Sequence, residues 1–234
     1  MTDMNTLALV IGGAVASIGL SGVGASIGQR MAASTSSLLM AEKPERFGIT
    51  LILTVLVETS AIYGLLVSIL ILANLGSATN IYQGLSALAA GLCVGIPGFF
   101  TGIGEGIASS ASIGAVAERE GVFGKTLVLT VLPETGAIYG LLIAVLILSG
   151  SGFLGEATAP LEQTGTASFY AAIVICITSV SSYLQGRVGG SAISATTKRD
   201  EIFGRDLIFV VLLESVLIYG LLTSILILTF NGVI

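Results

Sequence analysis

Three glutamates lie in the middle of stretches that are otherwise apolar enough to cross a bilayer. They are Glu58, Glu134 and Glu214, in LTVLVETSAIYGLL, LTVLPETGAIYGLL and VVLLESVLIYGLL. A charge at the centre of a membrane helix costs about 2.5–3.5 kcal/mol on insertion scales, so such residues are rare and usually functional. The threefold repetition predicts that these carboxylates do the chemistry of the chain, by binding and releasing a proton or a small cation.

The residues that follow each glutamate are repeated as well. A hydroxyl comes directly after it and a tyrosine five residues later; these residues are Thr59, Thr135 and Ser215, and Tyr63, Tyr139 and Tyr219. Only the first copy has a second hydroxyl, Ser60, where the others have Gly136 and Val216. A buried carboxylate must be paired, hydrogen-bonded or protonated, and a hard cation prefers oxygen ligands. Both a proton and an alkali ion therefore fit this pattern.

A polar residue precedes each glutamate by 29 positions: Gln29, Glu105 and Gln185. A short polar turn lies midway in each interval. If the two flanking segments are antiparallel helices, both residues lie about 14 positions from the turn, or roughly 20 Å at 1.5 Å per residue. The spacing predicts that each glutamate has a polar side chain at its own depth in the membrane.

These residues define a candidate ion site in each copy. In the first copy we expect ligands from the Gln29 and Glu58 side chains, the hydroxyls of Thr59 and Ser60, and the carbonyl of Leu56. The corresponding carbonyls in the other copies are those of Leu132 and Leu212. Each tyrosine is expected to donate a hydrogen bond to a glutamate carboxylate rather than to bind the ion, and which side chains of adjacent hairpins meet stays open.

The middle copy differs because Glu105 replaces the glutamine. Two carboxylates at one level repel each other, so one of Glu105 and Glu134 is expected to hold a proton. A protonated Glu105 still offers a carbonyl oxygen, as glutamine would.

The composition indicates which elements carry these sites. The chain has 234 residues, of which 54% are hydrophobic and 10% charged, against about 25% charged in soluble domains. Runs long enough to span about 30 Å of hydrocarbon lie near residues 5–40, 47–73, 81–116, 122–148, 166–198 and 202–230. They are continuously apolar rather than alternating, which excludes a barrel. We predict an all-α membrane protein with six transmembrane helices.

The six helices form three tandem hairpins, in units 1–76, 77–152 and 153–234, with turns at 41–48, 117–124 and 197–204. The first helix of each hairpin carries small residues at four-residue spacing, for example Gly24, Gly28 and Ala32, and such faces let membrane helices approach closely. The second helices are bulkier. This predicts a tightly packed inner layer and an outer layer, and repeated units with self-complementary ends favour a curved array over ordinary bundle packing. The connector 149–166 is expected to be a spacer.

Basic residues predict the orientation. Those at the turns are Lys43, Arg46, Arg119, Lys125, Lys198, Arg199 and Arg205. The positive-inside rule then places the turns in the cytoplasm and both termini outside the cell membrane. There is no histidine, no CxxC motif and no phosphate-binding glycine loop, so the sequence indicates no nucleotide or cofactor site, and nothing indicates nucleic acid. Cys93 and Cys176 lie within apolar segments and are expected to be packing residues.

The mid-membrane carboxylate on each second helix, with a polar residue level with it, resembles the proteolipid (c or K) subunits of archaeal and bacterial V/A-type rotary ATPases. The resemblance covers the whole chain. It implies a non-catalytic subunit whose copies form a homo-oligomeric ring. The ring would turn against a stator subunit with an essential arginine, contact the central stalk at the cytoplasmic turns, and carry one H⁺ or Na⁺ per carboxylate. The glutamine, the hydroxyl and the tyrosine are similar to those of sodium-binding members, which favours Na⁺ over H⁺.

Two other classes of protein stay open at this point. A passive cation channel would line an aqueous path with the glutamates and would conduct on its own. A secondary transporter is less favoured because such proteins often use inverted repeats and broken helices, and here all three repeats run in one direction.

Overall fold

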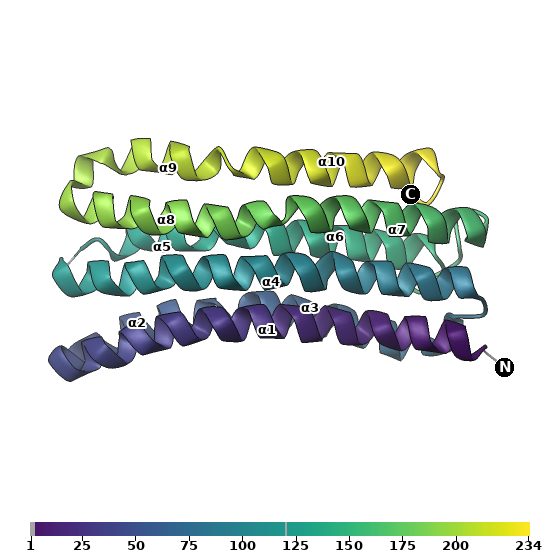
Figure 1. Ribbon diagram of the computed structural model, residues 1–234, viewed down its shortest axis with the longest axis horizontal. Coiled ribbons are helices and arrows are strands. Elements are labelled where there is room, and N and C mark those ends of the chain that lie inside the picture. The colour runs from purple at the N-terminus through teal and green to yellow at the C-terminus, as the bar shows by residue number, and fades with distance from the viewer. Residues whose placement is uncertain (1–2, 120) are drawn as a thin grey trace.

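The structure is a computed structural model that describes residues 3–119 and 121–234; residues 1, 2 and 120 lie outside it. All regular secondary structure in the described part of the chain is helical, which confirms the predicted fold class. The helices form three tandem hairpins, each with a first arm and a second arm that run antiparallel (Figure 1).

The first arms are α1 (Met4–Glu42), α4 (Ile81–Glu118), and α7 (Leu161–Thr178) continued by α8 (Val180–Lys198). The second arms are interrupted helices. They comprise α2 (Phe47–Leu56) and α3 (Thr59–Ala73); α5 (Phe123–Val131), η3 (Leu132–Glu134) and α6 (Thr135–Gly150); and α9 (Phe203–Val211) and α10 (Glu214–Phe230). Short 3-10 turns η1 (Pro44–Arg46), η2 (Leu75–Ser77) and η4 (Asp200–Ile202) connect arms or hairpins. The unit boundaries at 76/77 and 152/153 stay a prediction.

The first arms lie side by side and form one layer, in which α4 packs against α1 on one flank and against α7 and α8 on the other (Figure 1). Glycines allow this close approach. A Cβ atom added to Gly106 would fall on the backbone of Gly28, and one added to Gly186 would fall on the backbone of Gly104. The predicted small-residue packing between first arms is therefore confirmed.

The membrane spans agree with the prediction in number but not in regularity. Among the described residues, five helices are long and apolar enough to cross a membrane, and the bent pair Pro44–Leu56 and Thr59–Ala73 makes a sixth. That pair bends by 41° at its break. All three second arms are interrupted close to the glutamate, which the apolar runs alone do not indicate.

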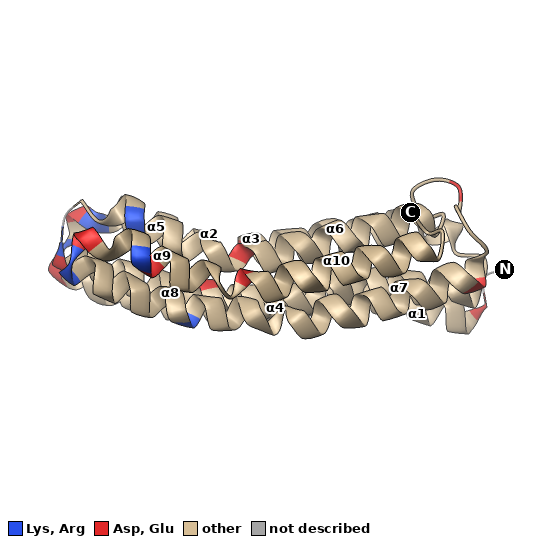
Figure 2. Cartoon of the chain, turned by 90° about the horizontal axis from the view of Figure 1, so that it is seen from above, with Lys and Arg blue, Asp and Glu red and all other residues tan. Residues whose placement is uncertain are grey.

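Charged residues gather at the end of the bundle that holds the hairpin turns (Figure 2). With 39 residues, α1 is about 58 Å long, well beyond the roughly 30 Å of a hydrocarbon core. The turn end can therefore extend past the bilayer, where its charges are solvated.

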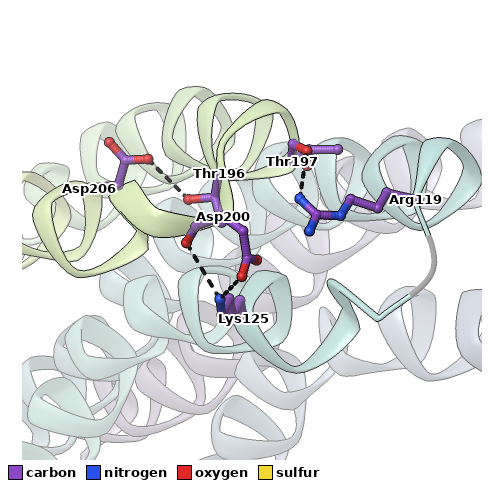
Figure 3. A network of polar contacts seen from close by, with 6 residues as sticks. All are labelled: Arg119, Lys125, Thr196, Thr197, Asp200 and Asp206. Carbon is purple, nitrogen blue, oxygen red and sulfur yellow. Dashed lines mark hydrogen bonds and ion pairs between the residues drawn. The ribbon is translucent and has the colours of Figure 1, made fainter.

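Neighbouring hairpins are tied together at the turns. Lys43 Nζ donates to the Ala117 carbonyl at 2.7 Å, and Arg119 Nη1 donates to the Thr197 carbonyl at 3.4 Å. Lys125 Nζ also pairs with Asp200 Oδ2 at 2.5 Å (Figure 3). The last carbonyls of a helix have no partner within the helix and carry its partial negative charge. Lys43 and Arg119 therefore cap the ends of α4 and α8, each from an adjacent hairpin.

The connector 149–166 packs against the rest of the structure. Phe153 is 2% exposed and belongs to the largest apolar core, and Thr158 Oγ1 donates to the Val233 carbonyl at 2.8 Å. The expectation that this segment is only a spacer is wrong, because it covers the core and holds the C-terminal residues.

Candidate functional site

Each second arm loses its regular helix at or just before the glutamate. In the first hairpin α2 ends at Leu56 and α3 begins at Thr59, and the Glu58 N–H donates to the Val55 carbonyl at 2.9 Å, three residues back. In the second hairpin the break contains Pro133, which has no N–H to donate. Such interruptions change the backbone hydrogen bonding beside the carboxylates.

First-arm hydroxyls bind carbonyls at two of these breaks. Thr101 Oγ1 donates to the Pro133 carbonyl at 3.2 Å, and Ser181 Oγ donates to the Leu213 carbonyl at 2.6 Å. Neither residue was predicted from the sequence. A signal was present, since each precedes the polar first-arm residue, Glu105 or Gln185, by four positions, which is about one helical turn.

The hydroxyl after each glutamate lies against the carbonyl predicted as its fellow ligand. Thr59 donates to the Leu56 carbonyl at 3.0 Å, Thr135 to that of Leu132 at 3.1 Å, and Ser215 to that of Leu212 at 2.8 Å. The structure therefore brings these pairs of oxygen atoms together in all three hairpins.

Two tyrosines bind the carboxylate of the following hairpin. Tyr63 Oη donates to Glu134 Oε1 at 2.7 Å, and Tyr139 Oη donates to Glu214 Oε1 at 2.9 Å. The structure thus settles a pairing that the sequence leaves open: these tyrosines reach across because the second arm of one hairpin packs against the next hairpin. Tyr219 follows the third glutamate and is 64% exposed at the open flank of the last hairpin.

The polar first-arm residues have three different environments. Gln29 Nε2 contacts Glu58 Oε2 at 3.4 Å, as the 29-residue spacing predicts. Gln185 Nε2 instead donates to the Val210 carbonyl at 3.3 Å. Glu105 is 0% exposed, and neither of its carboxyl oxygens has a hydrogen-bond partner.

Several buried oxygens without a hydrogen-bond partner lie near this depth. They are Ser60 Oγ, both carboxyl oxygens of Glu105, Ser182 Oγ and Gln185 Oε1. Buried polar groups are normally satisfied, and an orphaned one costs about 1–3 kcal/mol. A proton or a cation bound among these atoms would satisfy them.

The polar groups near the breaks are hydroxyls, carbonyls, amides and carboxylates. Among the described residues there is no cluster of three or more His, Cys, Asp or Glu that could hold a metal ion.

Comparison with known proteins agrees with the threefold repeat. The profile of the ATP synthase C subunit family matches three segments, residues 12–71, 88–147 and 169–227, one in each hairpin. This chain belongs to the ATP synthase C subunit family. Each segment that matches the family includes parts of both arms of its hairpin and the mid-membrane glutamate.

Relatives narrow the assignment within the family. The chain is 39% identical to the K subunit of the A-type ATP synthase of Methanocaldococcus jannaschii, over 94% of this chain and 96% of that protein. It is 35% identical to the K subunit of the V-type sodium ATPase of Enterococcus hirae, over 55% of this chain and 82% of that protein. It is also 29% identical to the 16 kDa proteolipid of the human V-type proton ATPase, over 58% of this chain and 87% of that protein. The chain is thus a non-catalytic, membrane-embedded rotor proteolipid of an A/V-type ATPase.

Proposed function

We propose that copies of this chain form a rotor ring that moves Na⁺ across the membrane by reversible binding at one glutamate per hairpin. The observation that carries the proposal is the hydrogen bond from Tyr63 to Glu134 and its repetition from Tyr139 to Glu214. These bonds support ion sites that lie at the boundaries between hairpins.

Two such sites are complete within one chain. The first combines Glu134 and Glu105 with residues of the preceding hairpin, which are the Leu56 carbonyl, Thr59, Ser60 and Tyr63. The second combines Glu214 and Gln185 with the Leu132 carbonyl, Thr135 and Tyr139. In the first site a carboxyl oxygen of Glu105 would act where the second has the amide oxygen of Gln185.

The third site needs two chains. Glu58 and Gln29 lie on the open flank of the first hairpin, and the Leu212 carbonyl, Ser215 and Tyr219 lie on the last hairpin. If the boundary between chains resembles the boundaries within a chain, Tyr219 donates to Glu58 of the next chain. Each added chain then completes one more site, which supports a closed ring rather than a single functional chain.

Other contacts between hairpins support the same boundary. When the hairpins are aligned on Gln29, Glu105 and Gln185, the cations Lys43 and Arg119 of the first two hairpins correspond to Arg199 of the third. The residues whose carbonyls accept from these cations, Ala117 and Thr197, correspond to Ala41 of the first hairpin. Similarly, Thr35 Oγ1 and Ser110 Oγ are 2.6 Å apart, and their equivalents at the chain boundary are Ser191 and Ser34. Both Ser34 and Ser191 are exposed in the single chain.

Cysteine cross-linking tests the ring. In a chain with Cys93→Ala and Cys176→Ser, we expect the pair Ser34→Cys and Ser191→Cys to form disulfides between chains on oxidation, because their equivalents are in contact. Denaturing electrophoresis should show a ladder of covalent multimers that ends at the size of the ring.

Two matched pairs control this experiment. Thr35→Cys with Ser110→Cys should cross-link within one chain and give no ladder. Ser36→Cys with Ser191→Cys should not cross-link, because Ser36 faces Thr54 of its own hairpin at 2.9 Å. Purified protein that runs as a single chain, with no ladder from the first pair, would refute the ring.

The proposed function also includes the partners of the chain and its orientation in the membrane. The hairpin turns face the cytoplasm and contact the central stalk, and both termini face outward. A stator subunit supplies an arginine that displaces the ion from each carboxylate, and the loaded, neutral site then moves through lipid. Each charge that crosses the field is worth about 2.3 kcal/mol per 100 mV.

The choice of Na⁺ rests on the oxygen ligands and on the similarity to a sodium ATPase subunit. We expect Na⁺ to slow modification of Glu58 and Glu214 by a carboxyl-reactive carbodiimide at fixed pH, because a bound cation keeps the carboxylate ionised and covered. Peptide mass spectrometry would follow each glutamate separately, with equal K⁺ as the control. If Na⁺ has no effect at either residue while lower pH speeds labelling, H⁺ is the transported ion.

A further inference from the structure

The second hydroxyl of the first site has no equivalent on the second arms of the other hairpins. Ser60 is fully buried, and its Oγ has no hydrogen-bond partner. The same position holds Gly136 in the second hairpin and Val216 in the third. From the second arms alone, the second site would therefore have one oxygen fewer than the first.

A serine from the facing arm lies at this place in the second site. A Cβ atom added to Gly136 would fall directly on Ser182 Oγ of α8. The Ser182 hydroxyl thus lies against Gly136, close to where a side chain equivalent to that of Ser60 would begin. In the first site the residue equivalent to Ser182 is Gly102, which has no side chain. In the first site the hydroxyl lies on the second arm and the glycine on the facing first arm, whereas in the second site the glycine lies on the second arm and the hydroxyl on the facing first arm.

The environment of Ser182 is that of a ligand rather than of a packing residue. It is 0% exposed, and its Oγ has no hydrogen-bond partner, although serines in helices usually bond their own backbone. Gln185 lies three residues further along α8, on the same face, and its Oε1 is also buried without a partner. Two orphaned oxygens therefore lie on the face of α8 that meets Gly136, and Tyr139, three residues after Gly136, binds the Glu214 carboxylate.

We infer that Ser182 supplies a hydroxyl ligand to the second ion site, in the role that Ser60 has in the first. This inference rests on the proposed function, because it assigns a further ligand to one of the proposed Na⁺ sites. The third site cannot repeat this arrangement, because Val216 has a Cβ atom at the place where, in the second site, a Cβ atom would fall on the serine hydroxyl.

Site-resolved carbodiimide labelling tests the assignment in assembled rings. Ser182→Ala keeps the Cβ atom and removes the oxygen. We expect the Na⁺ concentration that halves labelling of Glu214 to rise about tenfold or more, since a bond to a charged group contributes about 1.5–3 kcal/mol. Labelling of Glu58 should keep its Na⁺ dependence.

Two further variants separate a ligand from a structural role. Ser182→Gly combined with Gly136→Ser rebuilds the arrangement of the first site and should restore Na⁺ protection of Glu214. Ser168→Ala removes another buried hydroxyl without a partner, on α7, about 21 Å along the arm from Ser182, and should change nothing.

The outcomes are distinguishable. Unchanged protection of Glu214 in Ser182→Ala, or an equal loss in Ser168→Ala, overturns the assignment and leaves the Na⁺ sites in place. Absence of Na⁺ protection at every glutamate of the unmodified ring overturns the Na⁺ part of the proposed function, and the assignment with it.

Discussion

Glu214→Gln is expected to abolish ion-coupled ATP turnover in the assembled complex. Glutamine has nearly the same size and can still accept the hydrogen bond from Tyr139, so the ring should assemble. It cannot ionise, however, and therefore cannot exchange an ion with the stator. Because every hairpin must pass the stator in each rotation, one inactive site per chain stops the rotor. ATP-driven Na⁺ uptake into vesicles that hold the reconstituted complex would measure the loss.

The same result is expected for Glu58→Gln and Glu134→Gln. Glu162→Gln provides the control, because this residue lies in the exposed first turn of α7 and far from the sites, and it should leave uptake unchanged. The ion-carrying role would be refuted if the three glutamates were each replaceable by glutamine without loss of coupled uptake.

Gly106→Leu is expected to prevent correct packing of the first two hairpins. The backbones of α1 and α4 approach so closely here that a Cβ atom on Gly106 would overlap the Gly28 backbone. Overpacking of a core typically costs about 1–3 kcal/mol, and the cost rises where the neighbour is backbone and cannot repack. We expect most of the purified protein to aggregate, and the remainder to lose its thermal unfolding transition in detergent.

Gly114→Leu serves as the comparison within the same helix. A Cβ atom at Gly114 meets nothing within 4 Å, so this variant should purify and unfold like the unmodified chain. If Gly114→Leu aggregated as much as Gly106→Leu, the loss of folded protein would come from the replacement of a helix glycine and not from the contact with α1.

The sequence predicted the features that depend on distance along the chain. The fixed spacing between Gln29 and Glu58 determines their depth once the turn between them is known, and the structure confirms their contact. The four-residue spacing of glycines determines one helix face, and the close contact of Gly28 with Gly106 confirms what such a face is for. Both inferences need only the geometry of a single hairpin.

The lateral arrangement of the hairpins was beyond the sequence. The five-residue offset from Glu58 to Tyr63 determines on which face of the helix the Tyr63 side chain lies, but not which hairpin packs against that face. Only the packing of α3 against the second hairpin gives Tyr63 the acceptor Glu134. The breaks in the second arms were missed for a similar reason: Pro133 signals one of them, whereas those near Glu58 and Glu214 contain no residue that forbids a helix.

The covalent fusion of three hairpins limits how the gear ratio of the motor can change. Each chain brings three carboxylates, Glu58, Glu134 and Glu214, so under the proposed function a ring that gains or loses one chain changes its ion count by three at once. A rotor built from single hairpins could adjust the ions carried per revolution one at a time. For this chain, adaptation to a weaker ion gradient must proceed in steps of whole chains.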